Sequence, residues 1–114
     1  MRQTQSTKNR FPAALKAARK SLNITQEAFG LVSSRTYVSS LERGLKTPTL
    51  NKVDALADVL GIHPLTLLTL AYVGKDRTRS AAELQEIVSR QLQPMLDDAE
   101  LPEMMSGANL AGSN

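Results

Sequence analysis

The segment 25–44, TQEAFGLVSSRTYVSSLERG, constrains the fold of this chain more than any other feature. It indicates two short helices with a tight break between them, and the second helix has two unlike faces. At 100° per residue, one face gathers cationic and hydroxyl-bearing side chains within about 140°. These are Arg35, Thr36, Ser39, Ser40 and Arg43, and they oppose Tyr37, Val38 and Leu41. Because one face can be buried while the other suits hydrogen bonds to base edges and phosphates, the pattern favours binding in a DNA major groove.

Short motifs in and after this segment match a known pattern. Thr25-Gln26-Glu27 stands at the start of the first helix, Ser34–Ser39 starts the second, and Leu41–Gly44 ends it. Here the chain resembles the helix-turn-helix of XRE/Cro-type transcriptional regulators, which include lambdoid phage repressors, restriction-modification controller proteins and antitoxins. The similarity continues through Pro48-Thr49-Leu50 and covers roughly residues 10–72. It implies a lambda-repressor-like DNA-binding domain.

The chain departs from the family pattern inside the motif. The family's Gln and Glu lie two residues further apart than Gln26 and Glu42 do, and Gly30 stands where Ala is usual. The missing residues must come from the end of the first motif helix or from the turn. We expect Phe29, Val38 and Leu41 to fill the junction between the two helices nonetheless.

Apolar residues recur at helical spacing along most of the chain, which predicts an all-α fold. We expect a five-helix domain with an additional C-terminal helix, in which Leu50, Val53, Leu56, Ala57 and Leu60 form the buried stripe of the fourth helix. The expected helices span residues 11–22, 25–31, 34–44, 49–60 and 64–72, and Pro94 should end or bend the sixth. The expected organisation is a disordered arm 1–9, a DNA-binding domain 10–73, a linker 74–80, a C-terminal helix 81–96 and a flexible acidic tail 97–114.

The charges are divided between the two ends of the chain. Residues 1–80 carry 13 Lys/Arg against 5 Asp/Glu, a net +8, whereas residues 81–114 carry 1 against 6, a net −5. A solvated surface with an ordinary acidic tail would also account for this. Because the positive charge coincides with the groove-reading motif, we interpret it as a surface for double-stranded DNA.

The resemblance implies roles for individual residues. Arg35, Thr36 and Ser40 occupy positions at which relatives contact base edges, with Ser39 next, and an Arg there typically pairs with guanine. Gln26 resembles a phosphate-clamping Gln, and the residues after the second helix should meet the DNA backbone. The expected DNA-binding set is Gln26, Ser34, Arg35, Thr36, Ser39, Ser40, Arg43, Lys46 and Thr47. For each of these the alternative is an ordinary solvated side chain.

Glu42 could suggest catalysis, but the resemblance implies a partly buried salt bridge with Arg19. The chain has no Cys, a single His at position 63 and no Gly-rich phosphate loop. These absences argue against an enzyme, a metal site or a cofactor, and His63 beside Pro64 is better interpreted as a cap or surface residue. No apolar run approaches the ~20 residues of a membrane span, and no signal peptide is visible. We therefore expect a cytoplasmic protein, associated with a bacterial or phage nucleoid and not with a membrane.

Two functions remain open from the sequence. The first is a sequence-specific transcriptional regulator, expected to be a repressor that binds a palindromic operator as a homodimer through helix 34–43. Its monomers would join through a C-terminal apolar stripe of Leu84, Ile87, Val88, Gln91 and Leu92, or through the leucine-rich helix 64–72. The second is an antitoxin that binds its own promoter and, through its C-terminal segment, a toxin.

Overall fold

The computed structural model describes residues 9–73 and 80–98 of the chain. The expected N-terminal arm, linker and acidic tail fall almost entirely outside these ranges, as does most of the segment that the antitoxin hypothesis requires. The described residues divide into two compact units, with the boundary after Ala81.

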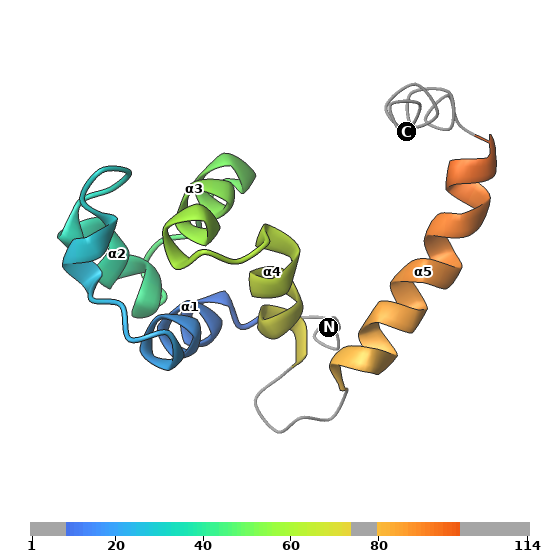
Figure 1. Ribbon diagram of the computed structural model, residues 1–114, viewed down its shortest axis with the longest axis horizontal. Helices are drawn as coiled ribbons and strands as arrows, with labels where there is room; N and C mark the ends of the chain where they lie inside the picture. Colours follow the sequence, from blue (N-terminus) through green and yellow to red (C-terminus); the bar gives the residue numbers. More distant parts are fainter. Residues whose placement is uncertain (1–8, 74–79, 99–114) are drawn as a thin grey trace. The chain divides into compact units, whose positions relative to one another are not determined.

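The first unit contains five helical elements (Figure 1). They are α1 (Phe11–Ser21), the 3₁₀ helix η2 (Gln26–Phe29), α2 (Arg35–Glu42), α3 (Leu50–Leu60) and α4 (Pro64–Val73). Helix α5 (Ala81–Asp98) belongs to the second unit except for its first residue, and the described ranges contain no strand. The expected all-α fold, with an additional C-terminal helix, is confirmed.

The first motif helix is shorter than the sequence predicts. We expected an α-helix to Leu31, but η2 is a 3₁₀ turn that ends at Phe29. Its bonds run three residues back, from the Ala28 N–H to the Thr25 carbonyl and from the Gly30 N–H to the Glu27 carbonyl. Leu31 in the turn that follows is fully exposed.

A small, mainly aliphatic core, which also includes Phe11 and Phe29, joins all five elements of the first unit. Its fully buried side chains come from every element, and their burial is the main source of stability for such a domain. The largest of them are Leu15, Phe29, Val38, Leu41, Leu56 and Leu67. The expectation for Leu50 is wrong, because it is 73% exposed. Leu50 is the first residue of α3, and the buried stripe begins one turn later at Val53.

Side-chain caps fix where the helices begin. The Ser34 hydroxyl accepts a hydrogen bond from the Tyr37 N–H at 3.0 Å, and the Thr49 hydroxyl accepts one from the Lys52 N–H at 3.1 Å. Such caps satisfy backbone donors that a helix start leaves free. Gly61 ends α3 in the left-handed conformation, with φ 75°, which favours glycine. His63 Nδ1 accepts the Leu65 N–H at 3.0 Å, so the single histidine caps the start of α4.

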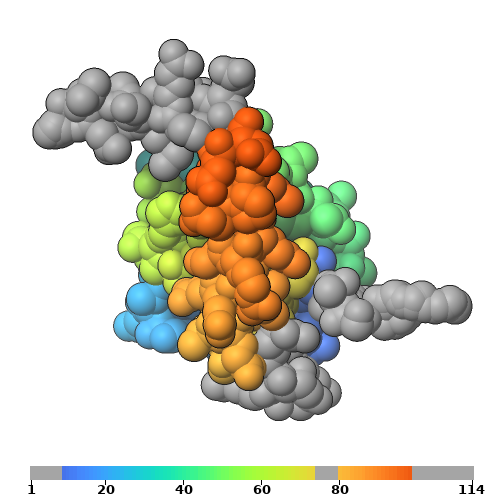
Figure 2. Space-filling model, turned by 90° about the vertical axis from the view of Figure 1, so that its right-hand side faces the viewer, coloured from blue at the N-terminus to red at the C-terminus, as the bar shows by residue number. Residues whose placement is uncertain are grey.

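Helix α5 has no buried residue (orange in Figure 2). It does not end at Pro94 but continues to Asp98, so the expected boundary at residue 96 is two residues short. Pro94 lacks an N–H for the carbonyl of Arg90. Both residues are exposed, so water can take that carbonyl and the helix can continue.

Among the described helices, none is by itself long and apolar enough to cross a membrane. Helices α3 and α4 reach that length and composition only together, across a bend of 104°.

Candidate nucleic-acid interface

One face of α2 packs against the hydrophobic core. Val38 and Leu41 are completely buried, and Tyr37 on the same side is half-buried. Arg35 and Thr36, in the first turn, are exposed, and Ser39 one turn later is half-buried. The polar face combines the long side chain of Arg35 with the short hydroxyl side chains of Thr36 and Ser39, which suits approach to a groove, while the buried face fixes the orientation of the helix.

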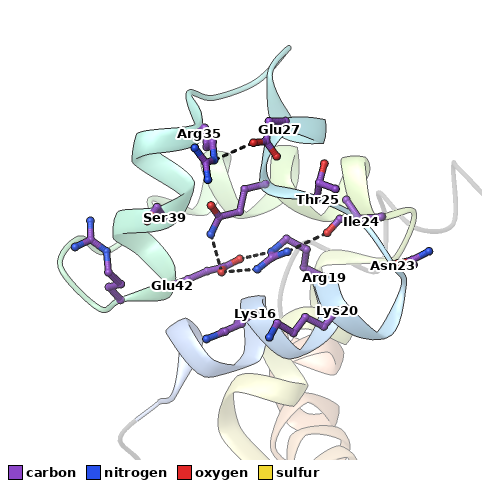
Figure 3. Close-up of a pocket in the computed structure, with 12 residues that line it drawn as sticks. Lys16, Arg19, Lys20, Asn23, Ile24, Thr25, Glu27, Arg35, Ser39 and Glu42 are labelled. Atoms are coloured by element: carbon purple, nitrogen blue, oxygen red, sulfur yellow. Dashed lines mark hydrogen bonds and ion pairs between the residues drawn. The ribbon is translucent and has the colours of Figure 1, made fainter.

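A salt bridge fixes the other end of α2 to α1. Arg19 Nε donates to Glu42 Oε2 at 2.6 Å, and Arg19 Nη2 donates to Glu42 Oε1 at 2.9 Å (Figure 3). The two side chains are only 13% and 4% exposed. The structure thus brings together the two residues that the family resemblance pairs. A bidentate pair of this kind constrains direction as well as distance.

The charge states of this pair are stabilised by their contacts. Burial alone would raise the pKa of Glu42, but the hydrogen bonds from Arg19 and Gln26 outweigh burial and hold that pKa below its ordinary value. The hydrogen bond to Glu42 raises the pKa of Arg19. Both groups are therefore ionised at neutral pH, and the pair acts as a structural clamp.

Gln26 joins this network at the start of η2. Its Nε2 donates to Glu42 Oε1 at 3.1 Å, which holds the side chain beside α2. The expected phosphate-clamping residue is thus positioned by the same carboxylate that anchors α2 to α1. One N–H of its amide remains for an anion outside the network.

An open hollow of about 560 Å³ adjoins this network (Figure 3). Its rim includes Lys16 and Lys20 of α1, Arg35 and Ser39 of α2, and Arg43 at the end of α2. Lys16 and Lys20 are exposed and were not among the expected DNA-binding residues. Their i, i+4 spacing, on the same side of α1 as Arg19, is the sequence signal that could have found them. The hollow thus collects cations from two separate segments of the chain.

The other residues of the expected DNA-binding set differ in how much of the side chain is exposed to solvent. Ser40 is only 7% exposed and belongs to the core side of α2, so a base contact from Ser40 is excluded and that expectation is corrected. On the helical wheel Ser40 lies at the edge of the polar face, where core packing covers it. The Ser34 oxygen is used as the cap of α2. Arg43, Lys46 and Thr47 are exposed at the end of α2 and in the loop that follows.

A contact that the sequence did not suggest supports the turn before α2. Lys52 of α3 donates from Nζ to the Val32 carbonyl at 2.7 Å, and the same ammonium lies 5.4 Å from the centre of the Tyr37 ring. A cation over an aromatic face is attracted to it. Lys52 therefore links α3 to both the turn and the first part of α2.

Metal ligands do not gather anywhere in the ranges 9–73 and 80–98. No group of three His, Cys, Asp or Glu side chains is close enough there to hold an ion.

Comparisons with known proteins fall on the same segment. Residues 15–67 match a family model described as helix-turn-helix, which spans η2, α2 and α3 completely. The control protein C.BamHI of Bacillus amyloliquefaciens is 35% identical over 54 residues, which are 46% of this chain and 67% of that protein. No solved structure matches the chain.

Proposed function

We propose, because the chain belongs to the XRE-type helix-turn-helix family of DNA-binding transcriptional regulators, that it is a sequence-specific repressor of a palindromic operator. In this proposal α2 lies in the major groove and two copies of the chain occupy two half-sites. Proteins of this family are generally not enzymes. A protein that reads an operator works where the chromosome is, so we place it in the cytoplasm.

The main support for the proposal is that contacts with the rest of the domain fix the orientation of α2. Completely buried Val38 and Leu41 fix one face, and the Arg19–Glu42 pair fixes its end. The exposed first turn therefore has a defined direction relative to the domain. Base recognition needs such a fixed helix, because a hydrogen bond to a base edge depends on both distance and angle.

The contacts divide by chemistry. Arg35, Thr36 and Ser39 are assigned to base edges, since they occupy the exposed or half-exposed side of α2. The DNA backbone is assigned to residues around the hollow and after α2, which supply affinity and little sequence information. These are Lys16, Lys20, Gln26, Ser34, Arg43, Lys46 and Thr47.

A second copy of the chain is expected because one recognition helix spans only a few base pairs. A dimer places two such helices on half-sites about 34 Å apart, one turn of the duplex. We assign the dimer contact to the α5 stripe of Leu84, Ile87, Val88, Gln91 and Leu92. Val88 is 52% exposed and Leu92 43%, which leaves apolar surface in water unless something covers it. The alternative is α4, where Leu65 is 63% exposed.

The antitoxin hypothesis would add a protein partner to the same DNA contacts. It depends on the segment 97–114, which lies outside the described residues except for Asp97 and Asp98. No observation on the described residues favours it over the repressor.

Selection from a pool of randomised duplexes tests this function directly. The full chain is expected to enrich one sequence with two inverted half-sites, spaced by one helical turn. The same sequence should occur in the DNA upstream of the chain's own gene, where the bound chain should protect it from nuclease. Binding of the chain at this sequence should reduce transcription of the gene. Recovery of duplexes without a shared sequence would contradict the proposal.

A further inference from the structure

An acidic side chain lies within the surface assigned to DNA. Glu27 of η2 contacts Arg35 of α2, with Glu27 Oε2 3.0 Å from Arg35 Nε (Figure 3). The two side chains are 62% and 67% exposed. A carboxylate at this place repels DNA phosphates, so its presence beside the main base-reading residue requires an explanation.

The geometry of the pair leaves part of the guanidinium available. The Glu27 carboxylate lies at ion-pair distance from Nε of Arg35, and within the described residues the ion pair with Glu27 is the contact of the guanidinium. A guanidinium has five N–H donors in one plane, and two parallel donors match O6 and N7 of guanine. Because the contact with Glu27 is at Nε, the terminal Nη1 and Nη2 edge can make the bidentate contact while the guanidinium stays paired with Glu27.

The surroundings of the pair favour a positioning role over a contribution to stability. An exposed ion pair adds little to folding. When DNA covers it, water is excluded and the attraction between the two charges increases. The guanidinium then has a fixed plane, which suits guanine but not the variable phosphate positions of an unrelated sequence.

We propose that Glu27 is a specificity-determining positioning residue, which holds Arg35 for guanine and opposes its capture by phosphates. This inference rests on the proposed function, because it requires that Arg35 reads a base. On operator DNA the fixed guanidinium offsets the repulsion between Glu27 and the phosphates. On other DNA the repulsion remains and Arg35 must leave Glu27 to reach a phosphate.

The test compares two duplexes: one recovered by the wild-type chain from the randomised pool, and a scrambled duplex of the same composition. Glu27→Gln keeps the size of the side chain and removes its charge. It should tighten binding to the scrambled duplex and lower the ratio of the two affinities by about two- to fivefold, the range for exposed ion pairs. In an Arg35→Ala background, Glu27→Gln should leave that ratio unchanged.

Glu86→Gln is the matched control. Glu86 is 4.0 Å from Arg90 in an exposed pair on α5, and its substitution changes the net charge equally. The control should leave the ratio of affinities as it is in the wild-type chain. An equal fall in that ratio for Glu86→Gln would show a net-charge effect and overturn the inference.

Other results would also overturn it. Equal tightening of both duplexes by Glu27→Gln would reduce Glu27 to a repulsive charge. A fall in the ratio that persists without Arg35 would show that Glu27 contacts a base itself, as a carboxylate can with cytosine N4. A wild-type chain with no preference for the recovered duplex would refute the proposed function as well, whereas a preference that Glu27→Gln leaves intact refutes this inference alone.

Discussion

Removal of the Glu42 carboxylate should destabilise the domain far more than removal of any exposed acid. In Glu42→Ala, Arg19 loses both hydrogen bonds to the carboxylate and keeps only the bond from Nη1 to the Ile24 carbonyl at 3.2 Å. Breaking a buried pair from one side costs about 3–5 kcal/mol. Because Arg19 is 13% exposed and can be partly rehydrated, the lower end is expected, about 3 kcal/mol.

Thermal unfolding followed by circular dichroism measures this loss. For a domain of this size, 3 kcal/mol corresponds to a fall in Tm of about 12 °C or more. The matched control is Glu27→Ala, which breaks an ion pair whose side chains are both more than 60% exposed. The control should cost less than about 1 kcal/mol. If Glu42→Ala lowers Tm no more than Glu27→Ala does, the Arg19–Glu42 pair does not hold α2 and the reasoning fails.

Two further predictions concern pH and assembly. The folded-state pKa of Glu42 lies below its unfolded value, so its contribution is present above about pH 4.3 and is lost as pH falls through the folded pKa. The difference in unfolding free energy between the wild-type chain and Glu42→Gln should therefore shrink as the solution is acidified, and a constant difference would contradict this. Deletion of residues 80–114 should leave a folded monomer in sedimentation, whereas Leu65→Glu on α4 should leave the full chain a dimer. A truncated chain that still dimerises would move the contact to α4.

Much of the fold follows from local patterns. The apolar spacing predicts the helices, and the caps Ser34 and Thr49 and the terminator Gly61 act on backbone groups only a few residues away. The type of η2 was not predictable in the same way. Its reduction to a 3₁₀ turn depends on how short a segment can bury Phe29 while connecting α1 to α2.

One error in the site and one in the core share a cause. A helical wheel gives the direction of a side chain but not how far the core extends around or along the helix. Ser40 at the edge of the polar face is therefore buried, and Leu50 at the start of α3 is exposed. The i, i+4 spacing puts Lys16 and Lys20 on one face of α1, but that face and Glu27 line the hollow beside α2 only because separate elements meet there.

Arg35 provides the most direct test of the account. The affinities of the Arg35→Ala and Arg43→Ala chains should be measured on the recovered duplex, on its single-base-pair variants and on a scrambled duplex. Arg43→Ala is the matched control, because it also removes one positive charge. Arg35→Ala should cost about 1–3 kcal/mol on the recovered duplex and remove the preference at one base pair of each half-site. Arg43→Ala should weaken binding to all the duplexes by a similar factor. An Arg35→Ala chain that loses affinity equally on the recovered and scrambled duplexes, with its preference at every position intact, would contradict base reading by α2.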